Sequence, residues 1–432
     1  MKIVEYPNQK ELQKVLQRPV FEVTNLEKTV QEIIKKVKTK GDQALKELSR
    51  QFDQVEVKNL KVSSEAIDNS EQLISNELKK ALHLAAENIA KFHKAQIPKE
   101  ITIETTKGVI CRQKPVPVEK AGLYIPGGSA PLISTVLMLA IPARLAGCKD
   151  IILCTPPNKD GSINPAILYA AKISGVTDIF TCGGAQAIAA MAYGTESIPK
   201  TDKIFGPGNQ YVTMAKQIIS SKGIAIDMPA GPSEVMVLAD ETANPEFIAA
   251  DLLSQAEHGA DSQVILVTNS NNIANQTLIC LNNQLEALSR KDIAEQSLES
   301  GAILIVKNEQ EMIKISNQYA PEHLIIATQN SDSVAEQITQ AGSVFVGNYT
   351  PESLGDYASG TNHTLPTNGF ARSYSGLNMD AFFKKITFQK ATKKGLELIG
   401  PFVEKIADTE QLQAHKNAVS IRLKTKKDDD KN

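Results

Sequence analysis

The chain has 432 residues, of which 42% are hydrophobic and 22% charged, and a formal net charge of −2 at pH 7. That length and composition suggest a globular protein of two to three domains. The near-neutral charge gives no electrostatic reason to expect nucleic acid or an anionic membrane as partner, and no apolar run is long enough to span a bilayer.

Cysteine usage and the start of the chain narrow the protein class further. The five cysteines are scattered and form no C-x-x-C pair, which argues against a disulfide framework and against a thiolate zinc site. Any metal would therefore use nitrogen and oxygen ligands. The opening residues lack the apolar core of a secretory signal, so we expect a cytoplasmic protein.

The first part of the chain is predicted to be mainly helical. Residues 1–18 indicate a small helical arm, and residues 26–92 carry apolar side chains at helical spacing. Alternating Thr and Ile in residues 101–115 predict short strands.

From residue 121 onward, strand-like runs alternate with apolar, alanine-rich segments of helical length, which predicts βαβ units around a parallel sheet. Its strands end in three glycine-rich turns, at 124–128, 182–186 and 206–209. Turns at the carboxyl ends of parallel strands are where open α/β sheets bind ligands. None has the G-x-G-x-x-G pattern, so a nucleotide site and plain strand-to-helix turns both remain open.

A second alternating region follows Gly231, and it predicts a second α/β domain. Its candidate strands are residues 235–238, 264–267, 302–306, 324–327 and 344–346. We therefore predict an α/β fold with two Rossmann-like domains, a cleft between them, and small helical modules at both ends of the chain. The expected boundaries are a helical arm at 1–24, a first domain at 25–120 and 233–378, a second domain at 121–232, a helical module at 379–423 and a disordered tail at 424–432.

A helix with its own start and stop signals is predicted by the stretch NPEFIAADLLSQAEHGADSQ. Asn244 can cap it, Pro245 suits its first position, and Gly259 suits a left-handed stop. Gln255 and His258, three residues apart, could bring an amide oxygen and an imidazole together as half of a metal site. An ordinary polar helix end explains the same residues without a metal.

Two further segments carry candidate chemistry. Glu322 and His323 immediately precede an apolar strand, and either is a competent general base if its pKa is tuned. Asp356 and His363 lie in a segment rich in Gly, Asn and Thr, where a carboxylate or an imidazole could bind zinc. These residues alone do not say which of the two ligates, and a surface pair and an ordinary solvated loop remain alternatives.

Near the end of the chain, Glu410 and His415 form a third candidate pair. The apolar residues around them could form a helical stripe, with His415 only on its flank.

In chain order, eight motifs closely resemble histidinol dehydrogenase: GLYIPGGSAPL, GGAQAIAA, IFGPGN, AGPSE, SQAEHGADSQ, APEHL, ESLGDYASGTNHTLPT and AHKNAVSIR. The resemblance runs from the first helices to about Leu423. It implies the last step of histidine biosynthesis, in which two NAD+ oxidise L-histidinol to L-histidine through a bound L-histidinaldehyde.

The resemblance also implies roles for individual residues and an intertwined homodimer with shared active sites. One zinc per subunit would be bound by Gln255, His258, Asp356 and His415, with His415 reaching the other protomer. His323 would remove the hydroxyl proton, and Glu322 would activate water. Contacts to substrate would come from Ser233, Gln255, His258, His323, Asp356, His363, Glu410 and His415, and contacts to the dinucleotide from Tyr124, Gln186 and Asn209.

Two other functions compete with this interpretation. A zinc hydrolase could use Glu322 and the metal to activate water on a small amide, although hydrolysis needs no dinucleotide turns. A non-catalytic protein could use zinc to bind a small imidazole compound, but two adjacent general bases would then have no purpose.

Overall fold

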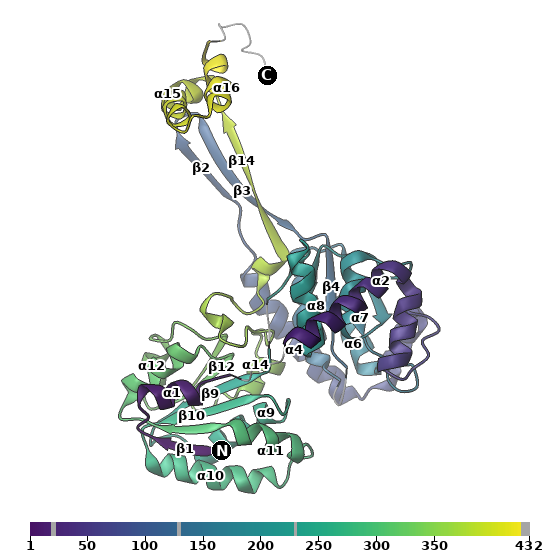
Figure 1. The fold of residues 1–432 in the computed structure, drawn as a ribbon, viewed down its shortest axis with the longest axis vertical. Coiled ribbons are helices and arrows are strands. Elements are labelled where there is room, and N and C mark those ends of the chain that lie inside the picture. The colour runs from purple at the N-terminus through teal and green to yellow at the C-terminus, as the bar shows by residue number, and fades with distance from the viewer. Residues whose placement is uncertain (19–22, 128–130, 229–230, 425–432) are drawn as a thin grey trace. The chain divides into compact units, whose positions relative to one another are not determined.

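The computed structural model describes residues 1–18, 23–127, 131–228 and 231–424. The chain divides into two units, and each is described by itself. The larger unit joins Met1–Gln96 to Val118–Phe382 and contains two parallel sheets flanked by helices (Figure 1). The smaller unit joins Ile97–Pro117 to the chain from Phe383 onward. The parallel sheets and their covering helices confirm the predicted α/β fold class.

The six-stranded sheet has the order β1-β11-β10-β9-β12-β13, and all its strand pairs are parallel. Its strands are β1 (Lys2–Glu5), β9 (Glu234–Ala239), β10 (Gln263–Thr268), β11 (Ala302–Ile305), β12 (His323–Ala327) and β13 (Ser343–Val346). Successive side chains point to opposite faces, so the apolar runs supply two separate cores. Val237 and Leu266 belong to one core, and Leu238 and Val267 to the other.

Helices cover both faces of this sheet. One core contains side chains of α9 (Pro245–Ala256), α10 (Asn271–Leu285) and α11 (Lys291–Ser300), and the other those of α1 (Gln9–Val15), α12 (Glu309–Tyr319) and α13 (Ser331–Ala335). Each fully buried Val, Leu or Ile contributes roughly 1.5–3 kcal/mol. This packing makes the sheet a rigid base for the side chains at its edge. Beyond β13 follow the short helix α14 (Glu352–Tyr357) and the 3-10 turns η2 (Phe370–Arg372) and η3 (Met379–Phe382).

The five-stranded sheet is also parallel, with the order β6-β5-β4-β7-β8. Its strands are β4 (Lys120–Tyr124), β5 (Asp150–Thr155), β6 (Asp178–Thr181), β7 (Lys203–Phe205) and β8 (Ala225–Ile226). The helices α2 (Val23–Phe52), α7 (Gly184–Tyr193) and α8 (Gln210–Ser221) share one core with it. A second group of packed helices comprises α3 (Ser64–Asn69), η1 (Ser70–Leu73), α4 (Asn76–Ala95), α5 (Ile133–Ala146) and α6 (Pro165–Ser174).

The strand order of this sheet changes direction at β4, with β5 and β6 on one side and β7 and β8 on the other. Ligands of open α/β sheets bind outside the carboxyl ends of the strands at such a switch point. The turn Gly206–Asn209, which leaves β7, lies at this place.

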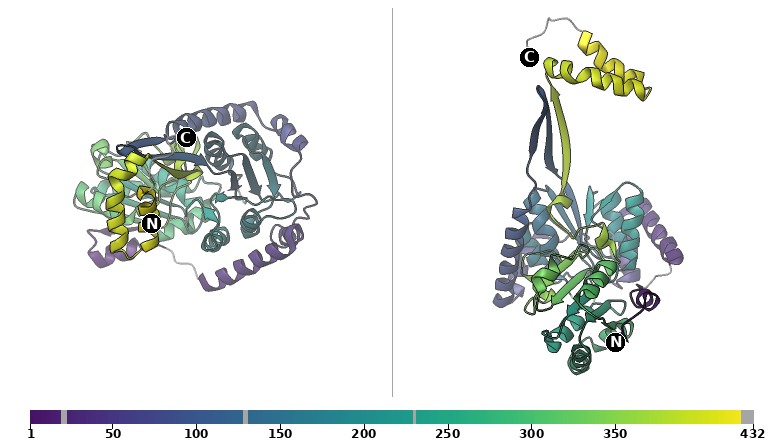
Figure 2. Two further views of the ribbon diagram at one scale, coloured as in Figure 1. Left: turned by 90° about the horizontal axis from the view of Figure 1, so that it is seen from above. Right: turned by 90° about the vertical axis from the view of Figure 1, so that its left-hand side faces the viewer.

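The smaller unit consists of an antiparallel sheet and two helices. Its strands β2 (Ile101–Thr106), β3 (Val109–Pro117) and β14 (Phe383–Ala391) have the order β14-β3-β2. The helices α15 (Lys393–Thr409) and α16 (Gln413–Lys424) pack against each other at one end of this ribbon (Figure 2). Several of its large apolar side chains are exposed to solvent, among them Leu398, Phe402, Ile406, Leu412 and Ile421.

The structure differs from the sequence prediction at both ends of the chain. Residues 2–5, within the predicted helical arm, form the strand β1, and residues 383–391 form β14 within the segment expected to be helical. Helix α9 begins as predicted, with the Asn244 side chain capping the Glu246 N–H, but it ends at Ala256. Gly259 therefore does not stop the helix, and its φ is not positive.

Two remaining expectations concern the tail and the membrane. The predicted disordered tail falls on residues 425–432, outside the described residues, except for Lys424, which ends α16. In the described parts of the chain, every helix is too short or too polar to cross a membrane.

Candidate functional site

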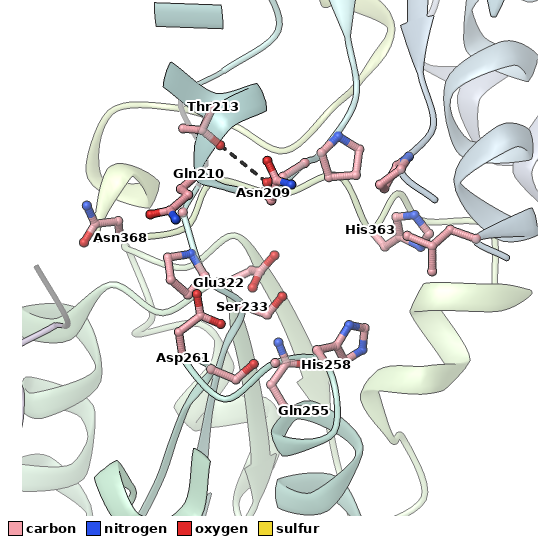
Figure 3. Close-up of a pocket in the computed structure, with 18 of the residues that line it drawn as sticks. Asn209, Gln210, Thr213, Ser233, Gln255, His258, Asp261, Glu322, His363 and Asn368 are labelled. Carbon is pink, nitrogen blue, oxygen red and sulfur yellow. Dashed lines mark hydrogen bonds between the residues drawn. The ribbon is translucent and has the colours of Figure 1, made fainter. Parts of the chain in front are cut away.

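A pocket of about 750 Å³ in the larger unit brings together residues from both parallel sheets. Its walls include the Gly206–Asn209 turn and the start of α8, which follow β7 of the five-stranded sheet. Ser233, Glu322 and His323 line it at the amino ends of β9 and β12 of the six-stranded sheet. Figure 3 shows Asn209, Ser233 and Glu322 facing a common space. The pocket thus joins the carboxyl edge of one sheet to the amino edge of the other.

The start of β12 carries two buried titratable side chains. Glu322 is 6% exposed and His323 is 3% exposed. The Glu234 N–H donates to Glu322 Oε2 at 2.8 Å, and His323 Nδ1 donates to the Glu234 carbonyl oxygen at 3.1 Å. These two bonds orient both side chains from one backbone position. His323 Nε2 has no hydrogen-bond partner among the described residues, and Asp356 Oδ1 lies 3.4 Å from it.

The two pKa values of this pair are shifted upward for different reasons. Burial disfavours the carboxylate of Glu322 and raises its pKa. Burial also opposes a charge on His323, but the carboxylates of Glu322 and Asp356 outweigh it and hold the ring pKa well above its ordinary value. The two neighbouring carboxylates favour the doubly protonated ring, and a cation bound to Asp356 would weaken the contribution of that carboxylate.

Asp356 and His363 lie on different kinds of structure. Asp356 belongs to the six-residue helix α14, rather than to the predicted long loop, and His363 follows in the loop beyond it. His363 Nδ1 donates to the Asp356 carbonyl oxygen at 2.8 Å, and its Nε2 lies 3.1 Å from the Thr135 hydroxyl on α5. Burial lowers the pKa of His363, which keeps the ring neutral.

Gln255 and His258 approach the pocket from the end of α9 and the turn after it. The Gln255 amide, oriented so that its nitrogen donates to Glu352 Oε1 at 2.9 Å, turns its oxygen toward the Glu234 N–H at 3.1 Å. Burial lowers the pKa of His258 and favours the neutral imidazole. For Asp356, burial favours protonation, but the neighbouring His323 outweighs it and lowers the carboxyl pKa.

A neutral imidazole at His258 and an ionised carboxylate at Asp356 are the forms in which these side chains bind metals. Gln255, His258 and Asp356 line one pocket and offer an amide oxygen, a neutral imidazole and a carboxylate. Only two of the three are among the His, Cys, Asp and Glu side chains, and the described residues contain no group of three such side chains that could hold a metal ion. A four-coordinate zinc site built on them needs a further ligand.

The three residues expected to contact a dinucleotide are placed differently. Asn209 lines the pocket, and its side chain caps α8 by accepting from the Tyr211 and Val212 N–H groups. Tyr124 and Gln186 are each 3% exposed and lie outside the pocket wall. The Tyr124 hydroxyl accepts a hydrogen bond from the Gly184 N–H, at the start of α7.

The last two candidates, Glu410 and His415, belong to the smaller unit. Glu410 follows the last residue of α15, His415 lies on α16, and both are exposed.

Sequence reasoning missed several polar residues that hold the site together. Glu234 is one of them: it ends the AGPSE motif and begins an otherwise apolar strand, but neither feature indicates its contacts. Thr135, which contacts His363, sits in an apolar helix and gave no signal. Arg18 lies 216 positions before its partner Glu234, so no local pattern relates them.

Comparison with known proteins gives a consistent result. A family model of histidinol dehydrogenase matches residues 16–423. The histidinol dehydrogenase of Bacteroides thetaiotaomicron is 56% identical over 427 residues, which cover 99% of this chain and 100% of the relative. That of Vibrio parahaemolyticus is 52% identical over 412 residues, 95% of each chain. The crystal structure of histidinol dehydrogenase from Elizabethkingia anophelis matches with a TM-score of 0.96 and 56% identity, covering 98% of each chain.

The fold and the pocket define a two-sheet α/β enzyme in which a glycine-rich turn faces a buried acid–imidazole pair. The match over nearly the full length of both chains identifies the family within this class of enzymes. The chain belongs to the histidinol dehydrogenase family and is an oxidoreductase, as its sequence motifs indicated.

Proposed function

We propose that this enzyme oxidises L-histidinol to L-histidine through a bound L-histidinaldehyde, with two NAD+ as hydride acceptors and one zinc ion per subunit. The observation that carries the proposal is the buried Glu322–His323 pair, which lines the same pocket as the Asn209 turn. Each oxidation removes a hydride and a proton, so each needs a base close to a dinucleotide. The choice of histidinol as substrate follows from the name of the relatives, histidinol dehydrogenase. A role in histidine biosynthesis also implies a cytoplasmic enzyme.

Gln255, His258, Asp356 and His415 are the zinc ligands of this proposal. The first three fit zinc, because they line one pocket wall and offer an amide oxygen, a neutral imidazole and a carboxylate. Zinc, when bound, supplies a redox-inert Lewis acid that orients the substrate and stabilises negative charge on its oxygen. Ser233, His363 and Glu410 complete the proposed contacts to substrate, together with His323 and the ligands.

His323 is the base of the first oxidation. A neutral ring keeps its proton on Nδ1, where it donates to the Glu234 carbonyl, and so leaves Nε2 to accept the hydroxyl proton of the substrate. Nε2 is buried and makes no hydrogen bond among the described residues, with Asp356 Oδ1 3.4 Å away, so it can accept a proton from substrate. Engagement of Asp356 by a cation would lower the ring pKa toward the range of a base.

Glu322 serves the second oxidation. The aldehyde must add water before it can lose its second hydride, and a carboxylate beside it can take the proton from that water. Burial raises the pKa of Glu322 and makes it a stronger base than an exposed carboxylate. A covalent thiol route would need an activated cysteine, whereas burial in β5 raises the pKa of Cys154.

Tyr124, Gln186 and Asn209 are the proposed dinucleotide contacts. Support is strongest for Asn209, which lines the pocket at the carboxyl end of the five-stranded sheet. Tyr124 and Gln186 are buried here, so their contact with the dinucleotide requires their side chains to rearrange.

We also propose a homodimer in which Glu410 and His415 complete the site of the partner chain. The exposed apolar side chains of the smaller unit support an association, because large apolar patches of soluble proteins mark interaction surfaces. An incomplete set of zinc ligands around Asp356 agrees with a donor from another chain.

An absorbance assay for NADH with histidinol, NAD+ and zinc-loaded protein tests the proposal. We expect NADH to form, and no NADH from folded, zinc-loaded protein would refute it. A zinc hydrolase would instead cleave small amides without NAD+, and a binding protein would bind histidinol without turnover.

A further inference from the structure

A largely buried ion pair links the acid–imidazole pair to the N-terminal segment of the chain, and its Arg18 lies at the pocket wall. Arg18 Nε lies 2.6 Å from Glu234 Oε1, and Arg18 Nη2 lies 2.9 Å from Glu234 Oε2. The two side chains are 15% and 4% exposed. Two parallel N–H···O bonds of this kind fix the carboxylate in position and plane, which a lysine cannot do.

Further contacts from Tyr319 and Ala320 fix the position of the Arg18 guanidinium. Its guanidinium lies 3.9 Å from the centre of the Tyr319 ring, and its Nη2 also donates to the Tyr319 carbonyl oxygen at 2.9 Å. The Tyr319 hydroxyl donates to Gln263 Oε1, and the Gln263 amide donates to the Gln17 carbonyl oxygen. A cation–π contact and four charge-assisted bonds compensate the guanidinium for its burial.

The backbone of Glu234 connects this ion pair to the site through two hydrogen bonds. Its N–H donates to Glu322, and its carbonyl oxygen accepts from His323 Nδ1. Its carboxylate additionally accepts from the Asn368 N–H at 2.8 Å, next to the pocket. The N–H and the carbonyl oxygen belong to the two peptides that flank the Glu234 Cα, so a shift of this residue's backbone would disturb the contacts of both the proposed base and the proposed water-activating carboxylate.

The N-terminal arm reaches this point because two of its elements are part of the six-stranded sheet domain. Strand β1 pairs with β11, and Leu12 and Leu16 are buried in the core that contains Met236 and Leu324. The arm therefore holds Arg18 at the amino edge of the sheet, where Glu234 begins β9.

We propose that Arg18 and Glu234 are positioning residues of the oxidation, so that the N-terminal arm is a working part of the active site. Neither side chain is assigned a contact with the reacting atoms. Their task is to hold the backbone of Glu234 on both sides of its Cα, so that Glu322 and His323 face the substrate in the correct orientation and the His323 proton stays on Nδ1. The inference rests on the roles proposed above for Glu322 and His323.

The test uses the variants Arg18→Gln, Arg18→Lys and Glu234→Gln in the full-length, zinc-loaded enzyme. Arg50→Gln is the matched control, because Arg50 forms an exposed pair with Glu56. The rates of the histidinol and histidinaldehyde oxidations are measured per folded, zinc-containing subunit, well below the unfolding temperature. Crystal structures of the variants report the side-chain positions of Glu322 and His323 independently of activity.

We expect Arg18→Gln to lower kcat for both oxidations by about 100-fold, with KM for histidinol changed by less than about threefold. Arg18→Lys should recover part of kcat, since it restores the charge without the paired geometry. Glu234→Gln should fall between wild type and Arg18→Gln, and Arg50→Gln should match wild type. In the crystals, the hydrogen bonds from residue 234 to Glu322 and His323 should be lengthened or broken.

Three results would overturn the inference. One is a kcat for both Arg18→Gln and Glu234→Gln within about threefold of wild type. Another is a raised KM with unchanged kcat, which would indicate a role in binding only. The third is a variant that loses kcat although its crystal structure retains the hydrogen bonds from residue 234 to both Glu322 and His323. If the wild-type enzyme forms no NADH from histidinol, the proposed function fails, while the crystal structures still test whether the ion pair positions the two side chains. Should Arg18→Gln not fold, Glu234→Gln and Arg18→Lys decide by the same criteria.

Discussion

Glu322 and His323 are two adjacent side chains whose pKa values are shifted by different causes, although both contact one backbone residue. Both contact Glu234, yet burial raises the pKa of the carboxyl and nearby carboxylates raise the pKa of the ring. The sequence predicted this pair because an acid and an imidazole precede an apolar strand. It could not predict Glu234 as their common support, because that contact joins two strands 88 positions apart in the chain.

Glu322→Gln should separate the two oxidations. Glutamine keeps the size of the side chain and can still accept the Glu234 N–H, but it cannot take a proton from water. We expect the second oxidation to slow by about 10²–10⁴-fold and the first to be affected much less. NADH formed per histidinol consumed should fall from two toward one, with aldehyde recovered by a carbonyl trap. A variant that still gives two NADH per histidinol at the wild-type rate would remove Glu322 from its proposed role.

At the scale of elements, the Gly206–Asn209 turn depends on a close backbone approach. Gly206 has a φ of +124°, and a Cβ there would lie 2.1 Å from the Tyr124 carbonyl oxygen. The buried Lys216 and Asp227 side chains bond to the Gly206 carbonyl and N–H, each at 2.8 Å. The turn therefore has no room to move away from an added methyl group.

Gly206→Ala should consequently raise KM for NAD+ and destabilise the enzyme much more than Gly223→Ala. Gly223 is the matched control, because its φ is +89° and a Cβ there would meet nothing within 4 Å. We expect Gly223→Ala to cost about 1–2 kcal/mol from backbone strain alone. Denaturant unfolding measures both variants. Equal losses of unfolding free energy would show that the close approach at Gly206 is unimportant.

Helix α4 supplies a pH-dependent contribution to stability. His93 is 1% exposed, donates from Nδ1 to the Ile89 carbonyl at 2.9 Å, and lies with Nε2 3.4 Å from the Asn362 amide nitrogen. Burial lowers its pKa. The unfolded chain therefore takes up a proton at higher pH than the folded chain, and stability falls as pH drops below about 6.5.

His93→Gln should remove this contribution. Between pH 7.5 and 5.5, the unfolding free energy of wild type should fall more steeply than that of His93→Gln, by up to about 1.4 kcal/mol per pH unit. Urea unfolding at several pH values gives both slopes. Parallel curves would mean that His93 does not contribute to the pH dependence.

The elements that the sequence failed to predict are those defined by distant partners. β1 reads as part of a helical arm, but it pairs with β11, about 300 positions further along. β14 is rich in lysine and exposed on most of its length, so no apolar alternation marks it as a strand. By contrast, the buried parallel strands β9 to β12 carry continuous apolar runs, and these were predicted to within two residues at each end.

At the scale of the whole molecule, the larger unit gathers most of the candidate site from both parallel sheets, whereas Glu410 and His415 lie on the smaller unit. The sequence motifs indicated every one of these residues through family resemblance. They could not indicate that Tyr124 and Gln186 are buried away from the pocket, because burial depends on how α7 packs on the sheet.

Mixed dimers test whether His415 serves the partner chain. His415→Ala and Glu322→Gln homodimers should each be impaired in forming histidine. Co-expressed chains should form heterodimers in which one of the two sites is intact, so about a quarter of the wild-type activity per subunit returns for random pairing. No recovery in purified heterodimers would mean that His415 acts within its own subunit or outside the site.

Counting NADH formed per histidinol consumed tests the proposed zinc-dependent oxidation in two steps. The measurement is made on zinc-loaded enzyme, after chelation, and after zinc is restored. We expect a ratio of two that is lost on chelation and returns with zinc. A ratio of one would contradict the second oxidation, and a ratio of two in the chelated enzyme would contradict the role of zinc.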